Sequence, residues 1–173
     1  DNAVWTNQFD NVANREAHIL TTGPEIWTQT RQTGLDGFIC ATGTGGTLAG
    51  TTRYLKDVSG GQVQCWLADP PGSVLHTYVQ TKRERMERKG NGSITEGIGQ
   101  GRLTSNLQPD IDLIDNSLHI EDEASSAMVF RMLDEEGLYI GASSALNLVA
   151  AARMAQKLGK GSKVATIICD GAA

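Results

Sequence analysis

Three continuous apolar runs are the feature that most narrows what this chain can fold into. They occupy residues 37–41, 63–67 and 164–169, and none alternates strictly between polar and apolar positions. Continuous apolar runs are typical of strands that are buried on both faces, as in a parallel sheet covered by helices. The 173 residues are enough to bury a sizeable core. We therefore expect an α/β fold built on a mostly parallel sheet.

Helical patterns separate the apolar runs. Thr22 is expected to begin one helix, because Pro24 and Glu25 suit the first turn. Repeated alternation of strand and helix predicts parallel strands joined by right-handed crossovers. A short apolar run at 138–140 is read as a further strand. The remaining expected helices follow the glycine-rich residues 43–47, span 122–136 up to Gly137, and span 143–158 up to Gly159.

Two segments are expected to lie outside the layered core. Residues 1–20 are polar and aromatic by turns, so we expect a loop that leads in from an upstream part of the protein. Residues 21–173 would then form the α/β domain. Residues 81–93, charged and then rich in glycine, are expected to form an exposed connection. Since the chain lacks an initial methionine and stops directly after an apolar run, we expect a fragment that is truncated at both ends.

Charge and cysteine content exclude several classes of protein. The net charge is −5 and there is no basic stripe, so nucleic acid is not an expected partner. No apolar stretch approaches the roughly 20 residues of a membrane span. Cys40, Cys65 and Cys169 each lie in an apolar run, and the sequence has no Cys-x-x-Cys motif. This sequence also shows no targeting signal. We expect three free, buried thiols, no metal site, and a reducing compartment, either the cytoplasm or the mitochondrion.

The strongest local signal is a glycine-rich loop between the first apolar run and a helix. Glycines let successive backbone N–H groups converge, and the helix start adds partial positive charge. The loop therefore predicts a phosphate cradle, with the two threonine hydroxyls as further donors. It lacks the lysine of a Walker loop, and Leu48 replaces the third glycine of a dinucleotide fingerprint. A tight turn that binds nothing is the alternative. The loop consists of Gly43, Thr44, Gly45, Gly46 and Thr47.

Two weaker signals lie further along the chain. Alternating glycines at 97, 99 and 101 would let a backbone approach a flat ligand closely, although a plain loop explains them as well. Ser143 is placed where a predicted strand gives way to a helix, at the sheet edge where ligands of α/β proteins collect. Simple capping of that helix is the alternative for Ser143.

Five motifs occur in one order and at a consistent spacing: QFDNxAN at 8–14, TTGPEIW at 21–27, GTGGT at 43–47, EGIG at 96–99, and EEG leading to GASS at 135–144. Together they resemble the cysteine synthase (O-acetylserine sulfhydrylase) family. The sequence ADPPGS at residues 68–73 and the charged insertion at 81–93 resemble sequences of the fungal branch of that family.

The resemblance implies a fold and a cofactor. The fold is the tryptophan-synthase-like fold of pyridoxal-phosphate enzymes (fold type II), a three-layer sandwich with a mostly parallel sheet. The loop Gly43–Thr47 would hold the phosphate of pyridoxal 5'-phosphate, and Ser143 would hydrogen-bond its pyridine nitrogen. Gln8 would help to bind the substrate carboxylate, and Gly97 would lie beside the bound amino acid.

The resemblance also implies a reaction and partners. The reaction is β-replacement, which makes L-cysteine from an O-acylserine, O-acetylserine, and sulfide. A neutral hydroxyl at Ser143 agrees with this chemistry because it does not force protonation of the ring nitrogen. The family's Schiff-base lysine lies on an upstream Ser-x-Lys-x-Arg segment, which this sequence lacks. We therefore expect an inactive second half that needs its N-terminal half, a homodimer, and serine acetyltransferase as a partner.

Two other functions compete with this interpretation. Gly43-x-Gly45 after a strand, with Asp69 near the end of the next, passably fits a dinucleotide-binding oxidoreductase domain. The absent lysine also fits a non-catalytic module that keeps the fold in order to bind a partner.

Overall fold

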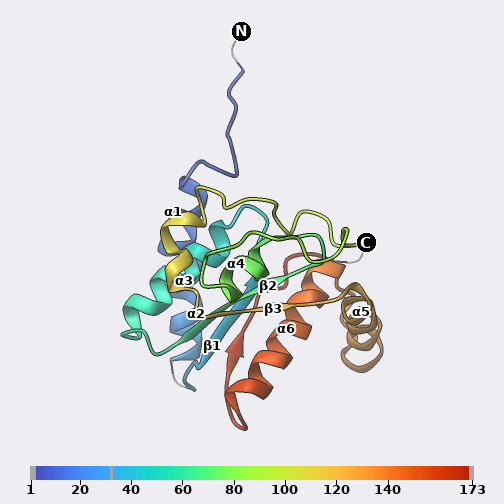
Figure 1. The fold of residues 1–173 in the computed structure, drawn as a ribbon. Helices are drawn as coiled ribbons and strands as arrows, with labels where there is room; N and C mark the ends of the chain where they lie inside the picture. The colour runs from blue at the N-terminus through green and yellow to red at the C-terminus, as the bar shows by residue number, and fades with distance from the viewer. Residues whose placement is uncertain (1–2, 32, 172–173) are drawn as a thin grey trace.

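A four-stranded parallel sheet forms the centre of the structure, a computed structural model that describes residues 3–31 and 33–171 (Figure 1). The order across the sheet is β3-β2-β1-β4, and every neighbouring pair is parallel, as predicted. In register, Phe38 lies opposite Cys65. The strands are β1 (Gly37–Ala41), β2 (Gln64–Asp69), β3 (Asn116–His119) and β4 (Val164–Ala165).

Helices cover both faces of the sheet and make a three-layer α/β sandwich. Along β1, Phe38 packs with the side chains of α3 and α4, whereas its neighbour Ile39 packs with those of α6. This burial on both sides explains the continuous apolar runs. One face carries α1 (Ala13–Leu20), α2 (Thr22–Thr30), α3 (Gly46–Val58) and α4 (Leu75–Gln80), and the other carries α5 (Asp122–Glu136) and α6 (Ala142–Leu158) (Figure 1).

The N-terminal segment corrects one expectation. Residues 13–20 form helix α1, not part of a loop. The helix lies directly on α3: a Cβ added at Gly50 would be 2.3 Å from the carbonyl oxygen of Arg15. No residue of α1 is fully buried, and half of its eight residues are polar or charged. The helix depends on its tertiary contacts.

The last apolar run also differs from its prediction. Only Val164 and Ala165 pair with β1, and Cys169 is exposed, unlike the buried Cys40 and Cys65. Beyond Ala165 the chain leaves the ladder and is held by side-chain bonds instead. The Thr166 hydroxyl donates to the Ile39 carbonyl of β1 at 2.6 Å, and the Asn147 amide of α6 donates to the Ile167 carbonyl at 2.9 Å.

Residues 138–140 do not form the predicted strand. Leu138 and Tyr139 are exposed, and Ile140 makes one isolated antiparallel bridge with Gly171. The helices on either side match the sequence, since Gly137 ends α5 in the left-handed region at φ +68°.

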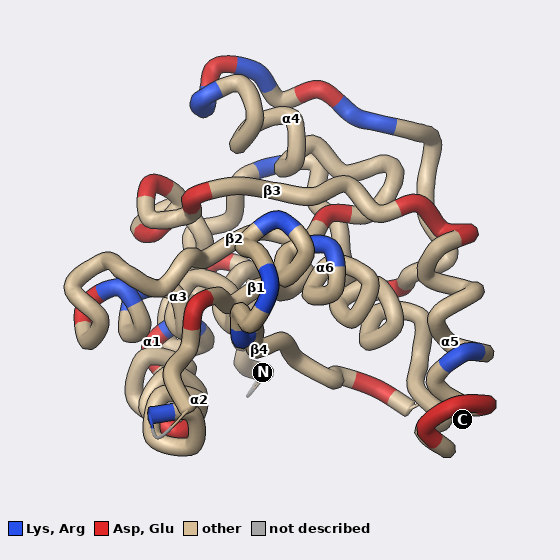
Figure 2. Tube along the Cα trace, turned by 90° about the horizontal axis from the view of Figure 1, so that it is seen from below, with Lys and Arg blue, Asp and Glu red and all other residues tan. Residues whose placement is uncertain are grey.

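The charged insertion is an exposed connection, as predicted. Residues 81–93 run between α4 and the 3₁₀ helix Gln108–Leu113 without regular structure of their own. Positive and negative residues are interspersed along it (Figure 2). Among the described helices, none is both long and apolar enough to cross a membrane.

Candidate functional site

The glycine-rich loop follows β1 directly and leads into α3. Among the described residues, the backbone N–H groups of Gly43, Thr44 and Gly45 have no hydrogen-bond acceptor. The first N–H groups of α3 also lack partners within the helix, as at any helix start. The buried Thr42 hydroxyl has no partner among the described residues either. These donors fit an anionic phosphate, which is the group that the predicted cradle requires.

The loop is closely covered on two sides. A Cβ at Gly43 would be 2.0 Å from the carbonyl oxygen of Gly97, and a Cβ at Gly46 would be 2.1 Å from Asn14 Oδ1. The Gly99 N–H donates to the Thr42 carbonyl at 2.9 Å. Glycine is therefore required at positions 43 and 46 for packing. The structure brings the carbonyl of Gly97 against Gly43 of the phosphate loop. The contact of Gly97 with a bound amino acid stays a prediction.

Residues of α1 and α2 hold the threonine hydroxyls of the loop. The Asn14 amide donates to Thr44 Oγ1 at 2.9 Å. His18 lies between two hydroxyls, with Nε2 3.0 Å from Thr47 Oγ1 and Nδ1 2.8 Å from Thr22 Oγ1. Burial lowers the pKa of His18, which favours the neutral ring with one donor and one acceptor nitrogen. When Nε2 is the donor, the hydroxyl hydrogen of Thr47 is free for a phosphate oxygen.

Gln8 lies at the rim of this loop. Its carbonyl oxygen accepts hydrogen bonds from the Asn106 amide at 3.0 Å and from the Asn14 amide at 3.4 Å. Since Asn14 also bonds Thr44, the backbone of Gln8 is fixed two hydrogen bonds away from the phosphate loop. Its side chain is exposed and free to reach a ligand.

Ser143 lies in the first turn of α6 and lines a cavity of about 440 Å³. Glu96, from the loop that contains Gly97, lines the same cavity. Ser143 Oγ is 3.2 Å from Cys169 Sγ. Asn147 joins α6 to the end of β1, because its side-chain oxygen accepts the Ala41 N–H at 2.7 Å. The predicted site residues therefore gather at one end of the sheet, where the parallel strands end.

Ser144 has a different environment from Ser143. It is fully buried, and its hydroxyl donates to the Asp170 carboxylate. The same oxygen accepts the backbone N–H of Cys169 at 2.9 Å and that of Asp170 at 3.0 Å. Ser144 thus fastens the final segment to α6, whereas Ser143 faces the cavity.

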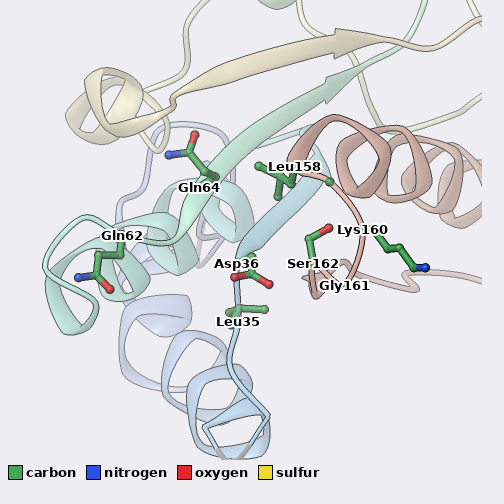
Figure 3. A pocket seen from close by; sticks show the side chains of 9 residues that line it. Leu35, Asp36, Gln62, Gln64, Leu158, Lys160, Gly161 and Ser162 are labelled. Atoms are coloured by element: carbon green, nitrogen blue, oxygen red, sulfur yellow. The ribbon is translucent and has the colours of Figure 1, made fainter.

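A larger cavity of about 550 Å³ lies at the opposite end of the sheet (Figure 3). Its lining includes Asp36, Gln64 and Ser162, and no predicted site residue contributes to it. Ligands of parallel α/β sheets collect beyond the carboxyl ends of the strands, so this cavity is not the candidate site.

Sequence reasoning missed the residues that hold the site in place. Besides Asn14, His18, Asn106 and Asn147, it missed Thr104, whose hydroxyl donates to the Thr44 carbonyl at 2.6 Å. These side chains come from three separate segments, which are α1, the loop before the 3₁₀ helix, and α6. Three of the five lie on helices, and the two others lie in an irregular loop. No spacing in the sequence relates them to the phosphate loop.

Asp69, at the end of β2, gives a pH-dependent prediction. Burial raises the pKa of Asp69 to about 7. The His76 N–H donates to the carboxylate at 2.7 Å and lowers the pKa, but this effect is smaller than that of burial. Between about pH 4 and 7 the Asp69 carboxyl is therefore protonated in the folded state and ionised in the unfolded state. Because the folded state binds the extra proton, the free energy of unfolding falls as the pH rises through this range. Between pH 5 and 8, Asp69→Asn should gain about 3 kcal/mol relative to the parent in urea unfolding.

The exposed Asp134→Asn is the charge-matched control for this measurement, and it should leave the pH dependence of unfolding as in the parent. An Asp69→Asn variant whose stability changes with pH as the parent's does would contradict the assignment.

Comparisons with known proteins identify the family of this chain. A family model described as "Pyridoxal-phosphate dependent enzyme" matches residues 1–170. Proteins called Cysteine synthase 1 from Neurospora crassa and Emericella nidulans are each 67% identical over 172 residues, which is 99% of this chain. The matched region makes up 45% and 46% of those proteins, so the chain spans about half of their length.

The fold has a close counterpart among solved structures. An O-acetylserine dependent cystathionine β-synthase from Helicobacter pylori superposes with a TM-score of 0.79 at 33% identity, over 95% of this chain and 49% of that one. These relatives support neither the dinucleotide-binding oxidoreductase domain nor the non-catalytic module.

Proposed function

Because this chain belongs to the family of pyridoxal-phosphate dependent enzymes, we propose that it is the phosphate-binding half of an enzyme that makes L-cysteine from O-acetylserine, or another O-acylserine, and sulfide. The observation that carries the proposal is the set of unpaired N–H groups at Gly43, Thr44 and Gly45, which the described part of the chain leaves without acceptors. Their position after a central parallel strand suits a cofactor phosphate.

In this proposal each part of the site has one task. The loop from Gly43 to Thr47 binds the cofactor phosphate, and Ser143 donates to or accepts from the pyridine nitrogen. Gln8 and Gly97 contact the amino-acid substrate. When bound, the cofactor supplies an electron sink for charge that develops at the substrate α-carbon. Residues 21–173 make up the cofactor domain, with residues 1–20 leading into it.

The lysine that binds the cofactor is proposed to lie in the part of the protein outside this chain. Lys56 pairs with Asp115 at 2.6 Å, and the other five lysines are exposed. A lysine that forms a Schiff base needs a lowered pKa, which an apolar pocket or a neighbouring cation provides. None of these six lysines has such surroundings, which supports a cofactor-binding lysine outside this chain.

Partners and compartment are also part of the proposal. We propose a homodimer that associates with serine acetyltransferase in a reducing compartment, the cytoplasm or the mitochondrion. The homodimer and the serine acetyltransferase partner rest on the family resemblance. The reducing compartment is supported by the three free cysteines at positions 40, 65 and 169, which an oxidising compartment would tend to pair.

The function is tested by restoring the upstream half of the protein. The full-length protein should be yellow with bound pyridoxal phosphate and should form cysteine from O-acetylserine and sulfide. This chain alone should stay nearly colourless, because a phosphate cradle without a covalent link holds the cofactor weakly. Strong, borohydride-reducible absorbance of the isolated chain would refute the assignment of the lysine to the upstream half.

Ser143 is predicted to tune the cofactor and not to act as the base. In the full-length protein, Ser143→Ala should keep the cofactor but slow cysteine formation, because one hydrogen bond to the ring nitrogen is lost. Ser143→Asp should be slower still, since a carboxylate favours a protonated ring and side reactions such as transamination. Steady-state rates with O-acetylserine and sulfide measure this.

Ser144→Ala serves as the comparison for Ser143→Ala. The Ser144 hydroxyl contacts five groups, all of them on Cys169 and Asp170. Its loss should therefore lower the free energy of unfolding by more than the worth of one hydrogen bond, which is about 1 kcal/mol. If Ser144→Ala lost its rate with unchanged stability while Ser143→Ala were silent, the role assigned to Ser143 would belong to Ser144.

A further inference from the structure

The hydroxyl of Ser73 holds both backbone groups of one distant residue. Ser73 is buried in the turn that follows β2. Its Oγ accepts the N–H of Gln100 at 3.0 Å and donates to the carbonyl oxygen of Gln100 at 3.1 Å. A serine hydroxyl can do both at once because it is donor and acceptor together. The Val74 N–H adds a second bond to the same carbonyl at 2.8 Å.

Gln100 ends the loop that presses on the phosphate cradle. Three residues earlier, the carbonyl of Gly97 lies against Gly43, and the N–H of Gly99 is bonded to the Thr42 carbonyl. Gly99 itself rests on the turn, since a Cβ there would be 2.8 Å from Pro70 Cγ. The loop is thus fixed at one end by Ser73 and abuts the cradle at the other.

The charged insertion braces the turn from its outer side. The Gly72 N–H donates to the Lys89 carbonyl at 2.7 Å, and the Lys89 N–H donates to the Ser73 carbonyl at 3.3 Å. The Arg88 guanidinium donates to the Gly72 carbonyl at 3.2 Å. Ser73 therefore lies between the insertion and the loop, and it joins the two.

We propose that Ser73 is a positioning residue that sets the place of the loop Gly97–Gly101 relative to the phosphate cradle. That this loop contacts a bound amino acid depends on the proposed function. The positioning itself rests on the hydrogen bonds above. Without the hydroxyl, the Val74 N–H still anchors the Gln100 carbonyl, but the Gln100 N–H loses its acceptor, so the loop is held less firmly at that end.

Hydrogen exchange of the full-length protein tests the positioning directly. In Ser73→Ala, exchange at the amides of Gly99 and Gln100 should quicken about tenfold, as for one lost hydrogen bond. The amides of β1 and β2 should keep their parent rates. Ser73→Thr, which keeps the hydroxyl, should restore slow exchange. Ser125→Ala is the matched control, because Ser125 is equally buried but bonds only within its own helix.

Kinetics of the same variants add a second readout. In Ser73→Ala, the KM for O-acetylserine should rise about tenfold. The affinity for pyridoxal phosphate, read from its absorbance, should stay within about twofold, because the cradle N–H groups are untouched.

Two outcomes would overturn the positioning role. One is parent-like exchange at Gly99 and Gln100 in Ser73→Ala, and the other is an equal rise across β1 and β2, which would mean a general loss of stability. Loop-specific exchange in a full-length protein that does not convert O-acetylserine and sulfide would refute the proposed function while supporting the role of Ser73.

Discussion

Valine in place of Gly45 is expected to lower the affinity of the full-length protein for pyridoxal phosphate by about a hundredfold, because backbone strain adds to lost phosphate contacts. Gly45 has φ +91°, a conformation that a β-branched residue rarely adopts. An added Cβ would also be 2.7 Å from Leu107 Cβ and 3.2 Å from the Leu107 backbone nitrogen. The loop must shift, and its N–H groups turn away from the phosphate. Titration with the cofactor, followed by absorbance, measures the loss.

The chain offers a matched control for this substitution. Gly161 has nearly the same backbone angle, φ +92°, with nothing within 4 Å of an added Cβ, and it lies at the opposite end of the sheet. Gly161→Val shares the strain without the clash and should bind the cofactor as the parent does, as should Thr28→Ala on the exposed side of α2. Parent-like affinity in Gly45→Val would show that the loop is only a turn.

Asp110→Ala is expected to cause the largest loss of stability, about 3–5 kcal/mol of the free energy of unfolding. The Asp110 side chain is fully buried between two arginines, one from α1 and one from α3. Arg15 Nη2 donates to its carboxylate at 3.0 Å, and Arg53 Nε donates at 2.8 Å. Alanine would remove the carboxylate that the two guanidinium groups share, and Arg53 would keep only its long contact with the exposed Asp57.

The loss should also reach the cofactor site, because Arg15 belongs to the helix that carries Asn14 and His18. Asp57→Ala is the control: Asp57 is 67% exposed, and its contact with Arg53 at 3.9 Å should contribute less than about 1 kcal/mol. Chemical denaturation of both variants decides the matter. If the free energy of unfolding of Asp110→Ala were within about 1 kcal/mol of the parent value, the role of Asp110 between the two arginines would be contradicted.

Local patterns predicted the layered fold and most of its helices. Continuous apolar runs mark β1 and β2 because a strand covered on both faces has no polar side. Gly137 and Gly159 mark the ends of α5 and α6 because each follows the last helical residue as its C-cap. The phosphate loop could be located for a similar reason, since glycines between a strand and a helix form a local signal.

The same patterns failed where a segment depends on distant contacts. Helix α1 has no buried residue, so its sequence resembles a loop. The apolar run at 164–169 looks like a strand, yet only its first two residues pair with β1. The carbonyl of Ile167 bonds a side chain of α6 instead, and Cys169 is exposed. Apolar character predicts burial in a core but does not say which backbone groups will supply the hydrogen bonds.

The sequence by itself determined the parallel α/β fold, the glycine-rich loop and the family. Tertiary structure alone decided how that loop is held: Asn14 on Thr44, His18 on Thr47, and the carbonyl of Gly97 on Gly43. The reason is physical. A strand, a turn or a cap depends on residues next to one another, whereas these contacts join segments that lie far apart in the chain and meet only when the helices pack on the sheet.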